Sequence, residues 1–224
     1  MLPKVIIPLQ PKSIADATRK IRSAEKDADL IEIWLDGIKN LTSQKVHIIV
    51  QTSKKPLILN LKDAVEHGSF TGTAKERFLL LSGSGAKFVD LPLNFPPRLI
   101  HKFREKNPFT KLILSWHDFV KMPNSQRLRT LANRAERLNA DVIKLVGTAK
   151  NYHDILPIIQ ISRELAGAQK SFLTMAMGEA GELTRILTPL LGGMGMFAVR
   201  NKKLQTAPGQ LTIAELKKWW QIFS

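Results

Sequence analysis

The amino-acid sequence predicts an α/β fold, a single (β/α)8 TIM barrel with a parallel eight-stranded core. Three observations support this fold class. Short apolar, β-rich runs alternate with amphipathic, helix-like stretches through all 224 residues. Eight such runs occur, each about 25–30 residues from the next. Neither a change in composition nor a long linker interrupts the series, so we expect one catalytic domain over residues 1–224.

The strands are expected where Val, Ile, Leu and Phe gather in short runs. These runs are KVIIPL from Lys4, DLIEIWLD from Asp29, PLILNL from Pro56, AKFVDLPL from Ala86, KLILSWHDF from Lys111, DVIKLVG from Asp141, SFLTMAMG from Ser171 and MFAVR from Met196. A doubly wound open sheet is the alternative fold. Such a sheet normally has a glycine-rich first turn, whereas PLQPKS follows the first run of this chain.

Helix-start signals lie between the strands. Thr73 is followed three residues later by Glu76, which is the pattern of a capping box. The last helix is expected to begin near Thr212, and we assign Trp219 and Trp220 to its apolar face.

The composition bounds the function. Apolar residues make up 44% and charged residues 24%, which are ordinary values for a globular chain with a sizeable core. The chain has no Cys, which excludes disulfides and thiolate chemistry. Its 34 Lys and Arg against 19 Asp and Glu give a net charge of +15. These basic residues are scattered through nearly every segment, so we expect no nucleic-acid partner and instead a surface that favours a small anionic substrate.

No targeting or membrane segment is expected. The start, MLPKVIIPLQ, lacks a long apolar region and a cleavage site. The longest uncharged stretch runs from Ile186 to Val199, which is too short for a bilayer and is interrupted by Pro189. A cytoplasmic protein without a membrane partner is therefore the expectation.

Polar residues inside apolar strands indicate the site. In a barrel strand, alternate side chains face the helices and the lumen. By this alternation the inward-facing residues include Glu32 and Trp34, Asn60 and Lys62, Ser115 and His117, and Lys144. We expect Glu32, Lys62, His117 and Lys144 to face one lumen, towards the carboxyl ends of the strands, where barrel enzymes build their sites.

Lys144 and His117 indicate the chemistry. A desolvated lysine near another cation is a nucleophilic amine, which condenses with a ketone or aldehyde to give an imine. The imine acidifies the adjacent carbon, and a histidine can remove that proton and later protonate a leaving hydroxyl. The sequence has no HExxH, P-loop or GxGxxG, and its five histidines lack ligand spacing, so we expect neither a metal nor a cofactor.

Four motifs in order along the chain resemble those of type I 3-dehydroquinate dehydratases. They are SWHDF at Ser115–Phe119, ADVIKLVGTAK around Lys144, MAMGEAGELTR ending at Arg185, and TAPGQ at Thr206–Gln210. Upstream, IEIWLD at Ile31–Asp36 and LKDAVEHGSF at Leu61–Phe70 fall where this family has its early substrate-binding segments. The resemblance covers the whole chain.

The resemblance implies a hydro-lyase that converts 3-dehydroquinate to 3-dehydroshikimate in the shikimate pathway of aromatic amino-acid biosynthesis. It implies that Lys144 forms the imine, that His117 acts as general base and then acid, and that Glu66 supports the histidine. It also implies substrate contacts from Glu32, Arg185 and Gln210, with the loop around Thr206 closing over the site. The partners it implies are this small anionic cyclic substrate and a second copy of the chain, in a homodimer.

The chain departs from the family pattern at several of these positions. Trp34 stands where the family usually has arginine, and Asn60 and Lys62 stand where it has Thr-x-Arg. Further departures are His67 in a Glu-Gly-Gly segment and Thr206 where a serine is usual. We count Trp34, Lys62 and Thr206 among the substrate-binding residues and predict a retained mechanism with weaker or altered substrate affinity.

Two other functions stay open. A different Schiff-base barrel, such as an aldolase, could use Lys144 on another carbonyl compound, although SWHDF and APGQ argue against it. A basic binding module that has lost full substrate binding is favoured only by Trp34 and the charge of +15.

Overall fold

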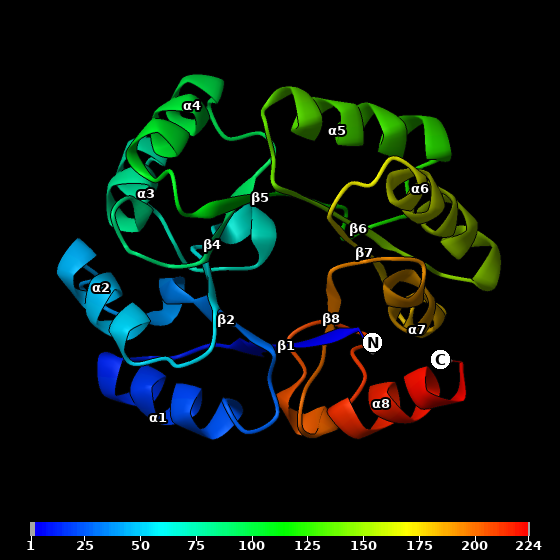
Figure 1. The fold of residues 1–224 in the computed structure, drawn as a ribbon, viewed down its shortest axis with the longest axis horizontal. Coiled ribbons are helices and arrows are strands. Elements are labelled where there is room, and N and C mark those ends of the chain that lie inside the picture. Colours follow the sequence, from blue (N-terminus) through cyan, green and yellow to red (C-terminus); the bar gives the residue numbers. More distant parts are fainter. Residues whose placement is uncertain (1–2, 224) are drawn as a thin grey trace. The chain divides into compact units, whose positions relative to one another are not determined.

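Eight strands alternate with eight α-helices along the part of the chain that the computed structural model describes, residues 3–223. The strands are β1 (Lys4–Leu9), β2 (Leu30–Trp34), β3 (Leu57–Asn60), β4 (Phe88–Pro92), β5 (Lys111–His117), β6 (Val142–Thr148), β7 (Phe172–Met177) and β8 (Gly195–Phe197). The helices are α1 (Ile14–Ala24), α2 (Ser43–Gln51), α3 (Ala74–Leu81), α4 (Pro97–Lys106), α5 (Ser125–Arg137), α6 (Leu156–Gly167), α7 (Glu182–Leu190) and α8 (Ile213–Ile222). The sheet order is β7-β6-β5-β4-β3-β2-β1-β8, which confirms the (β/α)8 fold class (Figure 1).

The chain forms two compact units. One is Ile7–Ile113, and the other joins the first residues up to Ile6 with those from Leu114 onward. The boundaries between the units therefore fall inside β1 and inside β5.

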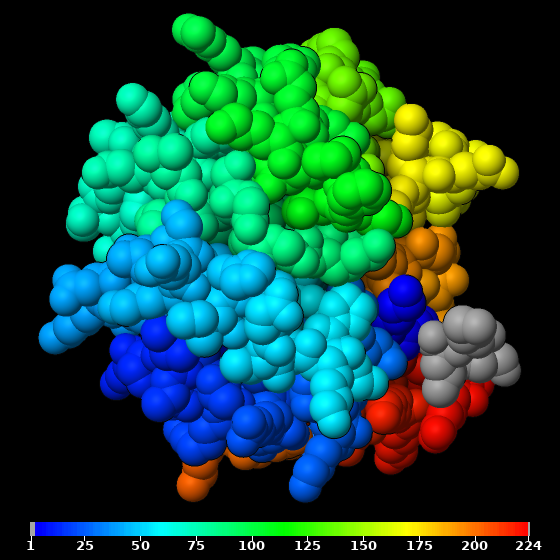
Figure 2. All heavy atoms as spheres, turned by 60° about the vertical axis from the view of Figure 1, so that its left-hand side comes forward, coloured from blue at the N-terminus to red at the C-terminus, as the bar shows by residue number. Residues whose placement is uncertain are grey.

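In the unit Ile7–Ile113, β2, β3 and β4 pair in parallel. Ile31 is opposite Leu57, Trp34 is opposite Asn60, and Asn60 is in turn opposite Asp90. The strands are buried almost throughout, as expected where helices cover a parallel sheet. Helices α1 to α4 form the face of this unit that comes forward in Figure 2.

In the other unit, β6 and β7 pair in parallel along their length, from Ile143 opposite Phe172 to Thr148 opposite Met177. The first half of β1 pairs with β8. Just before β8, the Met194 N–H donates to the Phe172 carbonyl at 2.9 Å, which brings the start of β8 beside the start of β7. Helix α8 is held by the Trp220 indole N–H, which donates to the Ile186 carbonyl at 3.1 Å.

The helix starts agree with the sequence signals. Thr73 and Thr212 each close a capping box, with Glu76 and Glu215 as their partners. Trp220 is buried on the apolar face of α8, as expected. Trp219 is 41% exposed, so its assignment to that face was wrong. It stacks instead on the ring of Phe223, one turn further along the helix, with the ring centroids 6.1 Å apart.

Several strand ends differ from the expected runs, and two of these differences concern β3 and β8. β3 ends at Asn60, so Lys62 lies beyond the strand, although it is buried as expected. β8 ends at Phe197 instead of Arg200, and Val199 forms only an isolated bridge with Thr212. None of the helices within residues 3–223 has both the length and the apolarity that crossing a membrane requires.

Candidate active site

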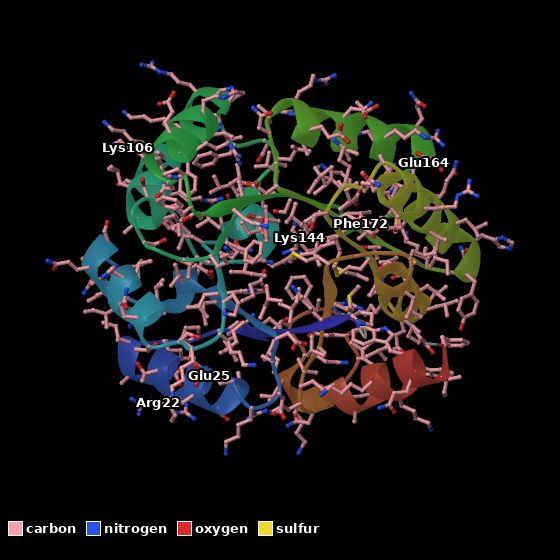
Figure 3. All side chains as sticks on the ribbon, in the orientation of Figure 1. Arg22, Glu25, Lys106, Lys144, Glu164 and Phe172 are labelled. Carbon is pink, nitrogen blue, oxygen red and sulfur yellow. The ribbon has the colours of Figure 1, made fainter. Side chains whose placement is uncertain are left out.

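Lys144 lies in the middle of β6 and is 3% exposed. Its neighbours Ile143 and Leu145 are buried too, and α5 precedes and α6 follows β6 along the chain. Figure 3 labels Lys144 and, on α6, Glu164. The Lys144 Nζ lies 4.7 Å from the centroid of the Phe197 ring on β8. An amine on an apolar strand, against an aromatic face, is thus largely removed from water.

His117 is the last residue of β5, the strand next to β6 in the sheet order. Its ring stacks on that of Phe119, with the centroids 5.7 Å apart and the planes 8° apart. The N–H of the following residue, Asp118, donates to the Val146 carbonyl at 2.9 Å. The end of β5 therefore runs alongside β6 two residues beyond Lys144, so the imidazole and the amine are carried by adjacent strands.

Arg185 is a buried guanidinium on α7. One of its terminal nitrogens contacts the Met175 Sδ at 3.7 Å, and the other donates to the Pro208 carbonyl at 3.2 Å. Its Nε has no hydrogen-bond partner among the described residues. Loss of hydration lowers the pKa of Arg185 to about 10, while the charge of Glu182 acts in the opposite direction. Arg185 is thus a cation at neutral pH with unused donor capacity, suited to an anionic ligand.

The segment that the TAPGQ motif marks is folded against Arg185. The Gln210 Oε1 accepts from the Thr206 N–H at 2.8 Å and from the Thr206 hydroxyl at 3.3 Å. Gly209 has φ +71°, and a Cβ there would lie 2.3 Å from the Gly178 carbonyl oxygen. Only glycine fits this position without displacing the segment. The motif thus brings Thr206, Gln210 and the Pro208 carbonyl to the side of Arg185.

In the unit Ile7–Ile113, Glu32, Trp34 and Lys62 form one cluster. The Trp34 indole N–H donates to the Glu32 Oε2 at 2.5 Å, as the shared strand face predicted. The Lys62 Nζ lies 3.9 Å from the centroid of the Trp34 ring. On the neighbouring strands, the Asn60 amide donates to the Asp90 Oδ2 at 3.3 Å, and both residues are buried.

The backbone after β3 turns sharply, which sets the place of Lys62. Its N–H donates to the Asp36 Oδ1 at 3.3 Å, and its carbonyl accepts from the Phe70 N–H at 2.9 Å. A Cβ on Gly68 would lie 2.3 Å from the Lys62 carbonyl oxygen, so the loop closes tightly on this residue. Asp36 ends the IEIWLD segment, but its contact with the Lys62 backbone could not be predicted because the two residues lie on different segments.

Glu66 is held by a residue that sequence reasoning missed. Buried Arg77, on α3, donates to the Asp63 Oδ2 at 2.8 Å and lies 3.9 Å from the Glu66 Oε2. Its guanidinium is also 5.3 Å from the centroid of the Phe70 ring. A basic residue on an amphipathic helix usually indicates a solvated face, so only the folded chain identifies this anchor.

The structure thus places the predicted residues in two groups, each within one unit. Lys144, His117, Arg185, Thr206 and Gln210 belong to the unit that contains β6, and Glu32, Trp34, Lys62 and Glu66 belong to Ile7–Ile113. That Glu32, Lys62, His117 and Lys144 face one lumen stays a prediction. Among residues 3–223, no cluster of three or more His, Asp or Glu side chains could hold a metal ion.

Comparison with known proteins points to one family. The family model for type I 3-dehydroquinase matches residues 5–224. A 3-dehydroquinate dehydratase of Methanococcus maripaludis is 32% identical over 219 residues, which cover 96% of this chain and 97% of the relative. A protein of the same name from Methanocaldococcus jannaschii is 29% identical over 223 residues, covering 97% and 98% of the two chains.

Solved structures agree on the fold. The 3-dehydroquinate dehydratase of Geobacillus kaustophilus superposes with a TM-score of 0.88 at 23% identity, covering 99% of this chain and 91% of the other. The type I enzyme of Clostridium difficile, solved with covalently modified comenic acid, gives the same TM-score and identity and covers 99% and 92%. The family match over almost the whole sequence confirms the resemblance of the four motifs. The chain belongs to the type I 3-dehydroquinase family.

Proposed function

We propose that this hydro-lyase family member dehydrates 3-dehydroquinate to 3-dehydroshikimate through an imine on Lys144, with His117 as general base and then general acid. The observation that carries the proposal is the burial of Lys144 on β6, against the Phe197 ring and on the strand next to that of His117. A lysine in such surroundings is suited to act as a nucleophile, because desolvation disfavours its charged form.

The proposed reaction balances without a cofactor. The Lys144 amine adds to the substrate ketone, and one water leaves as the iminium forms. His117 removes a proton from the adjacent carbon to give an enamine. The enamine expels the neighbouring hydroxyl, which leaves as a second water with the proton from His117. Hydrolysis of the conjugated iminium consumes one water and restores Lys144, so the net change is the loss of one water.

The remaining residues are proposed to bind the substrate or to support the histidine. Arg185 is suited to a substrate carboxylate, since its buried guanidinium keeps a free donor. Gln210 and Thr206 are proposed to contact the substrate from the loop folded against Arg185. Glu32, Trp34 and Lys62 are proposed to form the part of the site that binds the substrate ring, and Glu66 to support His117.

The test is turnover followed by trapping. The protein is incubated with 3-dehydroquinate, and the absorbance of the conjugated enone product is followed. Borohydride is then added, which reduces an iminium to a stable secondary amine. We expect turnover and a permanent adduct on the peptide that contains Lys144, located by mass spectrometry.

Two variants separate the steps. Lys144→Met should abolish both the adduct and turnover, while Lys150→Met, which alters an exposed lysine of the same segment, should leave both intact. His117→Gln should still be trapped by borohydride, with kcat lower by about 10²–10⁴-fold. Turnover that persists in Lys144→Met would rule out the imine. A wild-type chain that binds 3-dehydroquinate without converting it would instead indicate the binding module.

A homodimer is also proposed, from the resemblance alone, and a cytoplasmic location stays the expectation drawn from the sequence. Sedimentation of the purified chain at micromolar concentration tests the first, with a mass of about twice 25.2 kDa expected.

A further inference from the structure

Trp34 makes two different contacts with two oppositely charged, buried side chains. Its indole N–H lies at the edge of the ring and donates to Glu32 at 2.5 Å. The face of the same ring lies 3.9 Å from the Lys62 ammonium. Glu32 and Lys62 are both more than nine-tenths buried. One neutral side chain is therefore in contact with an anion at its edge and a cation over its face.

This arrangement matches the charge distribution of an indole. An aromatic ring is negative over its face and positive around its edge, and in tryptophan the N–H concentrates that positive edge. A carboxylate is thus stabilised in the ring plane, and an ammonium is stabilised over the face. Trp34 can hold both ions at once without adding a charge of its own.

The backbone also fixes this geometry. Trp34 and Glu32 are two residues apart on β2 and share a strand face. Trp34 is opposite Asn60 on β3, and Lys62 follows two residues later, held by its N–H to Asp36. The indole therefore has little freedom to leave either partner.

We propose that Trp34 is a positioning residue that sets substrate specificity: it holds Glu32 as a fixed acceptor and Lys62 as a fixed donor for the hydroxyls of a compact polyhydroxylated ring. This inference rests on the proposed function, in which Glu32 and Lys62 contact the substrate. Trp34 holds both side chains in place before the ligand binds. Substrate binding therefore does not have to supply the conformational entropy that ordering these two side chains would cost.

The test uses Trp34→Phe, which keeps an aromatic face and removes the N–H together with the five-membered ring of the indole. We expect KM for 3-dehydroquinate to rise about ten- to hundredfold, the range for one hydrogen bond to a charged group, with kcat within about twofold. Trp34→Leu also removes the ring face and should raise KM about two- to fivefold further. Trp219→Phe is the matched control, since Trp219 is exposed on α8, and it should leave KM unchanged.

Double-mutant cycles separate positioning from a general structural role. If Trp34 acts through Glu32, Trp34→Phe should have almost no further effect on KM in a Glu32→Met background, which removes the carboxylate acceptor for the indole N–H. The additional effect of Trp34→Leu should likewise vanish in a Lys62→Met background. Melting temperatures of all variants identify any chain that fails to fold. Changes in the free energy from KM that simply add in the double variants, or a fall in kcat with KM unchanged, would overturn the inference.

A spectroscopic measurement keeps this inference distinct from the proposed function. In protein labelled with ¹⁵N-tryptophan, the Trp34 indole N–H resonance should shift in Glu32→Gln, while that of Trp219 should not. Failure of the wild-type chain to convert 3-dehydroquinate would refute the proposed function. A Trp34 resonance that does not respond to Glu32→Gln would refute the inference, whatever the turnover.

Discussion

Arg185, which is proposed to bind the substrate carboxylate, carries a cost to stability. Its guanidinium is fully buried, and its contacts are a sulfur, a carbonyl and the charge of nearby Glu182, with no carboxylate bonded to it among the described residues. Desolvation lowers its pKa well below the ordinary value of an arginine, to about 10, so the folded chain holds this proton less tightly than the unfolded chain. The resulting loss of folding stability is complete below about pH 10 and fades as the pH rises through the folded-state pKa towards the higher pKa of the unfolded chain.

We therefore predict that Arg185→Met stabilises the protein while it weakens substrate binding. At pH 7 the buried charge is removed and the side-chain volume is largely kept, so the free energy of unfolding should rise by about 1–3 kcal/mol. The same change removes the proposed carboxylate contact and should raise KM at least about a hundredfold. Urea denaturation and steady-state kinetics measure the two effects. Arg134→Met, at an exposed position on α5, is the control and should change neither.

A lower stability for Arg185→Met would contradict this account. It would mean that the contacts of Arg185 with Met175 and Pro208 outweigh the cost of desolvation. The pH dependence gives a second check: the stability difference between wild type and variant should be constant from pH 6 to pH 9, because the pKa of about 10 lies above this interval.

At the scale of an element, the segment from Asp63 to Phe70 depends on one side chain from α3. Arg77 bonds to Asp63, lies near Glu66 and covers the Phe70 ring. Arg77→Met leaves the buried Glu66 without this cation, so we predict a loss of about 2–4 kcal/mol in the free energy of unfolding. Arg19→Met is the matched control, because its ion pair with Asp16 involves an arginine side chain that is 74% exposed; it should leave the melting temperature unchanged.

If Glu66 supports His117 as proposed, Arg77→Met should also lower kcat. Arg77→Lys should restore part of the stability, since it returns the charge without the two-pronged geometry. Wild-type stability in Arg77→Met would show that the segment is held by its backbone hydrogen bonds alone. Amide hydrogen exchange over residues 63–70 resolves whether the loss is local to this segment.

The elements also show what the sequence could and could not predict. Strand positions followed from apolar runs, and helix starts at Thr73 and Thr212 followed from their capping partners, because both signals are local. The burial of Lys144 followed from its strand neighbours. Strand ends did not follow: β3 stops at Asn60 because Asp36, from another segment, takes the Lys62 N–H and turns the chain. Arg77 was missed for the same reason, since its partners come from a loop rather than its own helix.

At the scale of the whole molecule, the chain is predicted to unfold as one domain, although it contains two compact units. The unit boundaries fall inside β1 and β5, between Ile6 and Ile7 and between Ile113 and Leu114. Each boundary therefore divides a strand, so β1 and β5 each run from one unit into the other. Calorimetry should give a single transition with a ratio of calorimetric to van't Hoff enthalpy of about 1.

The fragment Ile7–Ile113, expressed alone, should show no cooperative transition in urea, because it would end in the middle of β5 with exposed apolar strand faces. Two resolved transitions, or a cooperatively folded fragment, would show instead that the units are separate domains and that the continuity of β1 and β5 adds little to their stability.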